Sequence, residues 1–546
     1  MSGERILFTV AIALFLGLTT FQLALPGLHY DEAFEAVPAM QLLSHQPTTT
    51  FRGNGILVGG QLLPLMTQDY IGAINTYLAI PFFLFLGINM LSLRAMALAV
   101  GLVTLWLAFR LGKTLYGPTA AILAALLLSV NPTFVFWSRQ GVFVTSVTAA
   151  IGLGTVLSLL HWWRTGARRY ALIGAFLMGL GLYAKFLFLW LIVALGMAVT
   201  VLNFRRWKDF QRRVATGLVG WSIAAFLLGI APLILYNIQT GGTFASIREN
   251  LTTSYYGTNN LAFLHNLMER LGQLATVLTG GHFWYLGRGY ANWLNLGLFL
   301  AAFGLAAGLA NRSISDEVRL VFFPFLVIGG IVLASCTTVS ALWVTHFALV
   351  APWPPLAIAA AASRVIHHGA YSLSGKRVGL AIFLTLAIMG VSWVADIVTD
   401  VSYHRALGIS GGLGAHSDAI EDLSGWLAED MRGHTPVAAM DWGIAASVTF
   451  LTRGVVAPVE AFGYDWETDA EFANRLESFI RNPSSIYLWR APDEIVFDRS
   501  DDFKQLYEPL GLEEDILEAF YERSGRPVLG ATRLVPEGTA INPPRP

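Results

Sequence analysis

Long apolar runs separated by short polar stretches cover roughly the first 400 residues of the chain. A helix needs about 20 apolar residues to cross a bilayer. By this rule we predict about eleven transmembrane helices. Their ranges are residues 6–25, 92–111, 118–136, 142–162, 170–184, 186–203, 214–235, 291–310, 320–335, 343–362 and 378–398.

The segment 71–89 is also apolar, but it is short and carries Asn75, Thr76 and Gly87. If this segment does not cross and the N-terminus is cytoplasmic, the basic clusters, such as Arg164 with Arg168 and Arg169, lie in inner loops, as the positive-inside rule requires. If it crossed, every later loop would be inverted. We therefore expect a re-entrant or interfacial helix here, a first outer loop over about 26–91 and a second over about 236–290.

Composition supports a membrane protein, because 55% of the 546 residues are hydrophobic and 13% are charged. Soluble domains carry about a quarter charged residues. The formal net charge of −1 provides no basic field for a nucleic acid. Cys336 is the single cysteine, which excludes an intramolecular disulfide and a cysteine-built metal cluster. No small-x-small cleavage site follows residues 6–25, so we expect a retained membrane anchor.

After Val398 the long apolar runs stop and acidic residues become frequent. The segments 435–443, 485–489 and 526–534 read as strands, whereas 469–480 and 513–521 have helical spacing. We predict a small soluble α/β domain over 399–546 on the extracytoplasmic face. The transmembrane domain then covers 1–398, and the N-terminus is cytoplasmic.

Several polar residues are expected at the outer ends of these helices, and they are candidates for chemistry. A mixture of carboxylates and cations suits transfer from a phosphate leaving group, because a carboxylate can take a proton from a hydroxyl and cations stabilise the departing phosphate. The set comprises Asp31, Glu32, Asp69, Arg139, Lys185, His265, His282 and Arg288.

Each of these residues also has a purely structural interpretation. Asp31 can cap the helix that starts at Glu32, and Asp69 can cap the interfacial helix. Arg139 and Lys185 can reach the lipid headgroups from helix ends. An isolated histidine such as His282 or His346 is more often structural than a ligand. Carboxylates near hydrocarbon are rare, however, so we favour a functional role for Asp31.

The order of these residues resembles that of the C-type glycosyltransferases. The resemblance is to the protein O-mannosyltransferase and aminoarabinose transferase superfamily, whose members use polyprenyl-phosphate sugars. It covers about residues 1–362. It rests on Asp31-Glu32 after the first helix, on Ser138-Arg139 and Ala184-Lys185 after later helices, and on the stretch Gln68-Asp69-Tyr70-Ile71-Gly72-Ala73 with Leu86-Gly87-Ile88 and Leu93-Arg94.

The resemblance implies roles for individual residues. Asp31 matches the catalytic aspartate, and Glu32 matches the second acid. Arg139 and Lys185 match positions near the donor phosphate. Asp69 falls near a Glu-Lys-Pro motif whose lysine and proline are absent here. His346 stands where relatives carry a basic or aromatic residue facing the site. We also expect His282 to be a substrate-binding residue.

We therefore expect a polytopic enzyme of the cell membrane that transfers a sugar, with inversion, from a polyprenyl phosphate to an acceptor hydroxyl outside the cytoplasm. The acceptor is a protein, a lipid or a polysaccharide. The sequence requires no cofactor and gives no support for a metal. Two alternatives are a glycan ligase that uses a lipid-pyrophosphate donor, which Arg248, His265 and Arg270 of the second loop keep open, and a membrane transporter.

Overall fold

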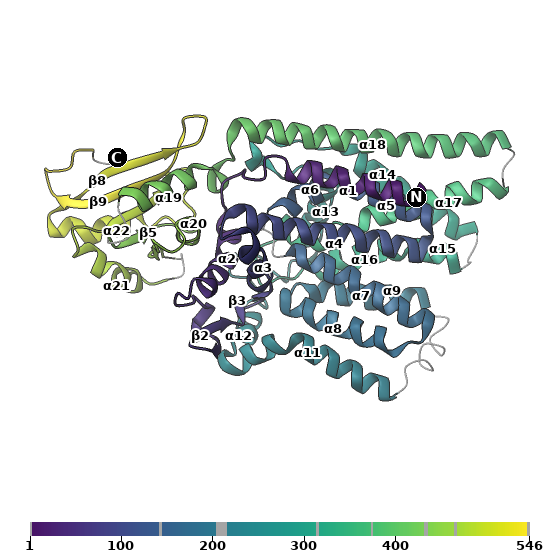
Figure 1. The fold of residues 1–546 in the computed structure, drawn as a ribbon, viewed down its shortest axis with the longest axis horizontal. Helices are drawn as coiled ribbons and strands as arrows, with labels where there is room; N and C mark the ends of the chain where they lie inside the picture. Colours follow the sequence, from purple (N-terminus) through teal and green to yellow (C-terminus); the bar gives the residue numbers. More distant parts are fainter. Residues whose placement is uncertain are drawn as a thin grey trace.

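A computed structural model describes residues 3–140, 145–203, 216–312, 316–372, 375–430, 435–463 and 467–542. It consists of a bundle of long helices and a smaller sheet unit that lies beyond one end of the bundle (Figure 1). The bundle is built from α1 (Gly3–Thr20), α4 (Met90–Tyr116), α5 (Pro118–Ser129), α6 (Pro132–Arg139), α7 (Thr145–Thr165), α8 (Arg168–Ala184), α9 (Phe188–Asn203), α11 (Thr216–Thr240), α12 (Gly242–Glu249), α13 (Phe263–Thr279), α14 (Trp293–Arg312), α15 (Asp316–Val321), α16 (Phe323–Ala334), α17 (Trp353–Ser372) and α18 (Gly375–Ser410).

Four helices of the described residues are long and apolar enough to cross a membrane, or six if each of two bent pairs counts as one span. The eleven predicted spans are therefore not confirmed. Proline explains part of the difference, because it lacks an N–H group and pushes the preceding residue out of the helical region. The predicted span 118–136 bends by 63° between α5 and α6, before Pro132. The predicted span 343–362 bends by 44° near Pro352.

The first loop forms a compact layer at the end of the bundle that faces the sheet unit, which we call the sheet-side end (Figure 1). It contains α2 (Tyr30–Leu43), the hairpin β1 (Gly55–Val58) and β2 (Gln61–Pro64), the hairpin β3 (Met66–Gln68) and β4 (Ile71–Gly72), and α3 (Ile74–Leu86). The helix expected within 71–89 is therefore present, as the short apolar helix α3.

A buried ion pair fixes α2 against α4. Both guanidinium and carboxylate are fully buried, and Nη2 of Arg94 lies 2.9 Å from Oε1 of Glu32. The Nε atom of Arg94 donates to the second carboxylate oxygen, and Nη1 donates to the carbonyl of Leu23. The pair therefore ties the start of α2, the start of α4 and the end of α1 together.

The C-terminal unit is a five-stranded sheet in the order β6-β5-β7-β9-β8. The strands β5 (Val437–Ala439), β6 (Val459–Glu460) and β7 (Ile486–Arg490) run parallel, while β8 (Leu512–Tyr521) and β9 (Pro527–Pro536) pair antiparallel. The helices α19 (Ala419–Asp430), α20 (Ala445–Leu451), α21 (Asp469–Ile480) and α22 (Ser500–Tyr507) complete it. The unit thus has the α/β composition predicted from the sequence.

Two elements differ from the sequence-based expectation, one in its end and one in its type. The last membrane helix continues to Ser410, beyond the predicted end at Val398. The segment 513–521 is not a helix but belongs to β8, whose register shifts between Ile516 and Glu518. A bulge of this kind interrupts the period-two alternation of a strand, which explains the misleading helical spacing.

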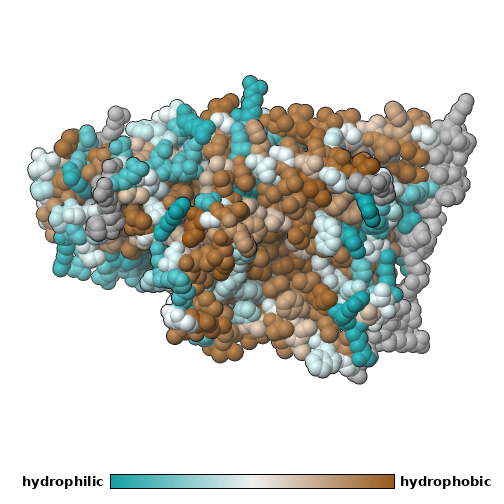
Figure 2. Space-filling model, viewed as in Figure 1, coloured by the Kyte–Doolittle hydropathy of each residue, from teal (hydrophilic) through white to brown (hydrophobic). Residues whose placement is uncertain are grey.

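The space-filling view supports a membrane-embedded bundle. Apolar residues dominate its visible surface, whereas polar residues gather on the sheet unit and at the opposite ends of the helices (Figure 2). Exposed apolar side chains such as Leu227, Phe383 and Val391 lie on α11 and α18, where lipid would cover them.

We predict that Arg94→Met lowers the free energy of unfolding by about 3–5 kcal/mol, because it leaves the Glu32 carboxylate buried without its partner. The double variant Arg94→Met/Glu32→Leu should recover much of that loss. The matched control is Arg481→Met, which breaks the exposed Arg481–Glu477 pair and should cost at most about 1 kcal/mol. Thermal unfolding of the purified proteins in one detergent tests the order. Equal effects of Arg94→Met and Arg481→Met would contradict it.

Candidate active site

Four of the polar residues singled out in the sequence fall into two separate groups. One group surrounds Asp31 and Lys185. The other group, with Glu32 and Arg139, is held by internal partners. The division follows from the direction in which each side chain leaves its helix.

Asp31 and Glu35 lie four residues apart on α2 and therefore share one face of that helix. The Asp31 side chain retains 40% of its accessible surface. It is nevertheless surrounded by protein, so burial raises its pKa to about 6, against the opposing effect of the Lys185 charge. Burial raises the pKa of Glu35 to about 8. The amide of Asn75 donates to the Glu35 carboxylate at 2.6 Å. Asp31 is thus accessible and easily protonated, whereas Glu35 is enclosed.

Lys185 lies between α8 and α9, where the first loop holds the chain. The backbone of Phe186 donates to the carbonyl of Tyr70 at 2.9 Å, and Lys185 pairs with Ile71 as an isolated antiparallel bridge. Burial lowers the pKa of Lys185 to about 8, although Asp31 and Glu35 both act to raise it. Within the part of the chain that the structure describes, the side-chain ammonium of Lys185 has no hydrogen-bond or salt-bridge partner. A nearly buried ammonium without a partner is well suited to receive an anion.

Arg270 is a further cation near this site, since its charge and that of Lys185 both act on His346. The Arg270 side chain is fully buried and donates through Nε to the carbonyl of Ser335 and through Nη1 to that of Trp343. Its guanidinium lies 5.3 Å from the ring centre of Trp190. Among the described residues, Nη2 of Arg270 has no hydrogen-bond partner. Arg270 therefore has one donor left for a ligand.

His346 lies close enough to both cations to interact with their charges. It is buried, and the charges of both Lys185 and Arg270 act on it. Its Nδ1 atom finds no hydrogen-bond partner in the described part of the chain. The His346 ring lies 5.7 Å from that of Trp343, which in turn lies 5.0 Å from that of Tyr256. Aromatic rings thus border the cationic side of the site.

Glu32 and Arg139 have internal partners instead. Glu32 is paired with Arg94, and adjacent residues on a helix point about 100° apart. The Glu32 carboxylate therefore faces away from Asp31. The Arg139 side chain is fully buried at the end of α6 and donates through Nη2 to the carbonyls of Phe21 and Gln22, at 2.7 and 2.5 Å. It joins α6 to the end of α1.

Asp69 and His282 also have structural surroundings. The Asp69 carboxylate accepts hydrogen bonds from Arg52 at 2.7 Å and from the hydroxyl of Tyr236 at 2.6 Å, which ties the first loop to α11. The His282 ring packs 5.0 Å from Trp137 and 3.9 Å from Phe283. Neither residue lies in the group around Lys185.

Two residues of the site were not singled out by the sequence. Glu35 follows Asp31 by four residues, and this spacing, which places both on one face of a helix, could have identified Glu35 from the sequence. Arg270 was noted only as part of the second loop. Its position beside His346 depends on the fold of residues 335–350, which no local pattern reveals.

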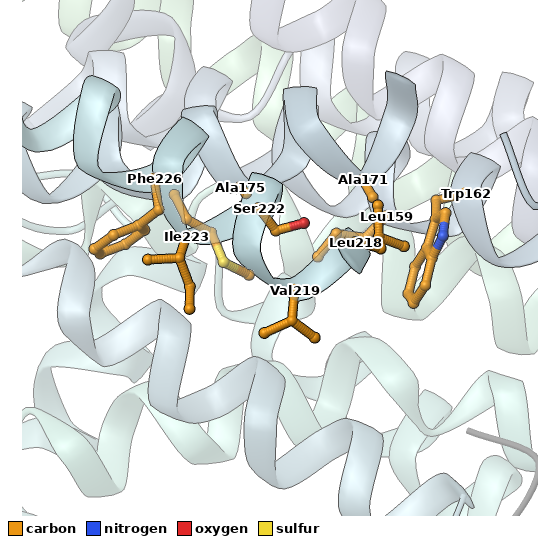
Figure 3. Close-up of a pocket in the computed structure, with 10 residues that line it drawn as sticks. Leu159, Trp162, Ala171, Ala175, Leu218, Val219, Ser222, Ile223 and Phe226 are labelled. Carbon is orange, nitrogen blue, oxygen red and sulfur yellow. The ribbon is translucent and has the colours of Figure 1, made fainter. Parts of the chain in front are cut away.

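An apolar pocket of about 320 Å³ lies elsewhere in the bundle, between α7, α8 and α11 (Figure 3). Its lining includes Trp162, Ala171 and Phe226. Ala171 is near the start of α8, and Lys185 follows the end of that helix, about 20 Å away at the usual helical rise. The pocket is therefore separate from the charged site. Among the described residues, no three His, Cys, Asp or Glu side chains are arranged to hold a metal ion.

Comparisons with known proteins agree with this architecture. Residues 74–236 match the family model of dolichyl-phosphate-mannose-protein mannosyltransferases. No curated protein matches the chain in sequence.

Solved structures show the likeness of the whole fold. ArnT from Cupriavidus metallidurans bound to undecaprenyl phosphate superimposes with a TM-score of 0.59 at 12% identity, over 100% of both chains. Its apo state gives a TM-score of 0.61 at 12% identity, over 97% of this chain and 98% of ArnT. The oligosaccharyltransferase of Archaeoglobus fulgidus gives 0.53 at 12% identity, over 89% of this chain and 69% of that one. The chain is therefore similar to the dolichyl-phosphate-mannose-protein mannosyltransferases over residues 74–236, and it shares its overall fold with ArnT and with the archaeal oligosaccharyltransferase.

Proposed function

We propose that the protein transfers a sugar from a polyprenyl-phosphate donor to an acceptor hydroxyl on the extracytoplasmic side of the membrane. The observation that carries this proposal is the opposition of Asp31 and Lys185 at the sheet-side end. An accessible carboxylate interacts electrostatically with a nearly buried ammonium that has no hydrogen-bond or salt-bridge partner among the described residues. A base and an anion site side by side are what this transfer requires.

The donor phosphate would bind between Lys185 and Arg270. Lys185 supplies a full positive charge, and Nη2 of Arg270 supplies a hydrogen-bond donor. His346 interacts with the charges of both and would add a ring nitrogen. The ArnT structure that holds undecaprenyl phosphate shares the fold of this chain, which supports a lipid phosphate as the ligand. The exposed apolar flanks of the bundle would let the lipid tail remain in the membrane.

The chemical step then needs one base and one group of cations. The acceptor oxygen attacks the anomeric carbon and forms the new glycosidic bond, while the bond from that carbon to the phosphate oxygen breaks. The electron pair leaves on the phosphate, whose charge grows from one to two negative charges. Asp31 takes the acceptor proton, and Lys185 and Arg270 stabilise the growing charge. Attack from the side opposite to the phosphate inverts the anomeric configuration.

The surroundings of the two acids assign different roles to Asp31 and Glu35. Asp31 is accessible and ionised above a pH of about 6, so it can accept a proton at neutral pH. Glu35 is enclosed, and its raised pKa keeps it largely protonated there. In this proposal Glu32 positions α2 through Arg94, and Arg139 positions α6. Neither touches the reacting atoms.

The glycan ligase is the one competing function that an observation favours, because Arg270 belongs to the second loop. A ligase would use a lipid-pyrophosphate donor. The two functions are separated by offering both donor types to the purified protein in lipid nanodiscs. Turnover of the monophosphate donor alone supports the transfer proposed here, whereas turnover of the pyrophosphate donor alone supports the ligase.

We predict that Asp31→Asn lowers the transfer rate by about 10²–10⁴-fold, because the amide cannot accept the proton. Glu35→Gln removes a neighbouring carboxyl from the same helix face and should retain most of the activity. The measurement is the release of radiolabelled polyprenyl phosphate from a panel of polyprenyl-phosphate hexoses and pentoses, with membranes as the source of acceptor. A well-folded Asp31→Asn protein that transfers at the wild-type rate would show that Asp31 is not the base.

The pH dependence should be bell-shaped. As the pH rises through about 6, Asp31 loses its proton and becomes competent as a base, so the rate increases. As the pH rises through about 8, Lys185 loses its charge and the rate decreases. Since arginine does not titrate in this range, Lys185→Arg should keep the acidic limb and move the alkaline limb to higher pH. An alkaline limb that stays in place in Lys185→Arg would assign it to another group.

A further inference from the structure

The parallel strands of the C-terminal sheet end beside the start of α2. The chain crosses from β6, on one side of β5, to β7, on the other side, so the carboxyl end of β5 is a point where the strand order reverses. In open α/β sheets the crevice at such a point usually receives a ligand. Here Trp442, which follows β5, packs against Tyr30, with ring centres 4.7 Å apart. The start of α2 in the first loop therefore packs at this end of the sheet.

The loop that carries Trp442 is held rigidly. The buried Asp441 carboxylate accepts from the backbone N–H groups of Val496 and Phe497, at 3.0 and 3.1 Å. The Arg490 guanidinium, at the end of β7, donates through Nε to the carbonyl of Trp442 at 3.1 Å and lies 3.5 Å from Asp441. These bonds fix the Trp442 backbone before it meets α2.

Two rings from the C-terminal region hold the residues that precede Asp31. Trp442 lies 6.0 Å from the ring of His29, in an edge-on arrangement, as well as against Tyr30. His416 stacks on His29 with ring centres 4.2 Å apart and planes inclined by 15°. The hydroxyl of Tyr30 donates to the Glu460 carboxylate of β6. Contacts from β5, β6 and the segment before α19 thus converge on two consecutive residues.

The stack continues into the bundle. Tyr285 stacks on the other side of His416 with ring centres 3.9 Å apart, and its hydroxyl donates to the side-chain carbonyl of Gln140 at 3.0 Å. His29, in turn, accepts a hydrogen bond from the backbone N–H of Asp31 through Nδ1 at 3.2 Å. His29 is therefore the N-terminal cap of α2 and joins the C-terminal contacts to Asp31.

We propose that Trp442 and His416 position Asp31 by holding His29 and Tyr30, so that the C-terminal unit is part of the catalytic machinery and not only a separate recognition module. These are positioning residues, because they act through the start of α2 and do not reach the reacting atoms. The inference rests on the proposed role of Asp31. Its structural half, that the C-terminal unit orders the start of α2, is independent of that role.

The test compares three variants of the full-length protein in lipid nanodiscs. Trp442→Ala removes the ring, and Trp442→Phe restores an aromatic contact. Trp426→Ala is the matched control, because Trp426 lies on α19 of the same unit and packs on Phe520 rather than on α2. Deuterium exchange of the amides of residues 30–36 reports order in α2. Steady-state turnover uses the polyprenyl-phosphate sugar that the wild-type protein processes fastest.

In Trp442→Ala the exchange of residues 30–36 should become about three- to tenfold faster, as expected from losing the aromatic contacts. The kcat should decrease by about tenfold or more with little change in the donor KM, since the phosphate site is untouched. Trp442→Phe should recover most of both quantities, and Trp426→Ala should resemble the wild type. If Trp442→Ala and Trp426→Ala behave alike in exchange and kcat, the proposal is overturned.

Two further outcomes of the test can each be interpreted. If the amides of β9 also exchange faster in Trp442→Ala, the whole unit is loosened, and His416→Ala becomes the deciding variant under the same criteria. If Asp31→Asn transfers at the wild-type rate while Trp442→Ala still loosens α2, the proposed base is wrong but the ordering of α2 by the C-terminal unit stands.

Discussion

The arrangement of the site depends on the rotation of α2 about its own axis. Glu32 is fully buried and bound to Arg94, and an unpaired carboxylate there would carry a large desolvation cost. The pair therefore holds α2 in a single orientation about its axis. Because side chains on a helix turn by about 100° per residue, that orientation directs Asp31 and Glu35 toward Lys185. The two adjacent acids therefore differ: Glu32 fixes the helix, and Asp31 remains accessible.

The cations follow the same division. Arg94 and Arg139 satisfy backbone carbonyls at the end of α1 and connect helices, as buried guanidinium groups do when no ligand is present. Lys185 and Arg270 retain unused donors or charge in the part of the chain described here. Nε of Arg139 also has no hydrogen-bond partner among the described residues, but Nη2 of Arg139 donates to two carbonyls near the end of α1. The C-terminal unit contacts His29 and Tyr30, the two residues that directly precede Asp31.

Much of this organisation could be predicted from the sequence. Apolar runs indicated a helical membrane protein, the loss of such runs after the last helix indicated an α/β unit, and Asp31 with Lys185 emerged from their positions at helix ends. The choice between Asp31 and Glu32 needed the family resemblance, because it depends on Arg94, 62 residues away along the chain. The sequence could not distinguish the role of Arg139 from that of Lys185. Only the tertiary structure shows that Arg139 donates to backbone carbonyls near the end of α1. The strand β8 was misread because a bulge breaks its alternation.

The central claim is that a lipid phosphate binds between Lys185 and Arg270, opposite Asp31. An experimental structure of the protein in nanodiscs with decaprenyl phosphate tests it most directly. The account predicts the phosphate about 3 Å from Nζ of Lys185, at hydrogen-bond distance, with the Asp31 carboxylate facing it across the acceptor space. A phosphate bound beside Arg139, with Lys185 left without a ligand, would contradict it.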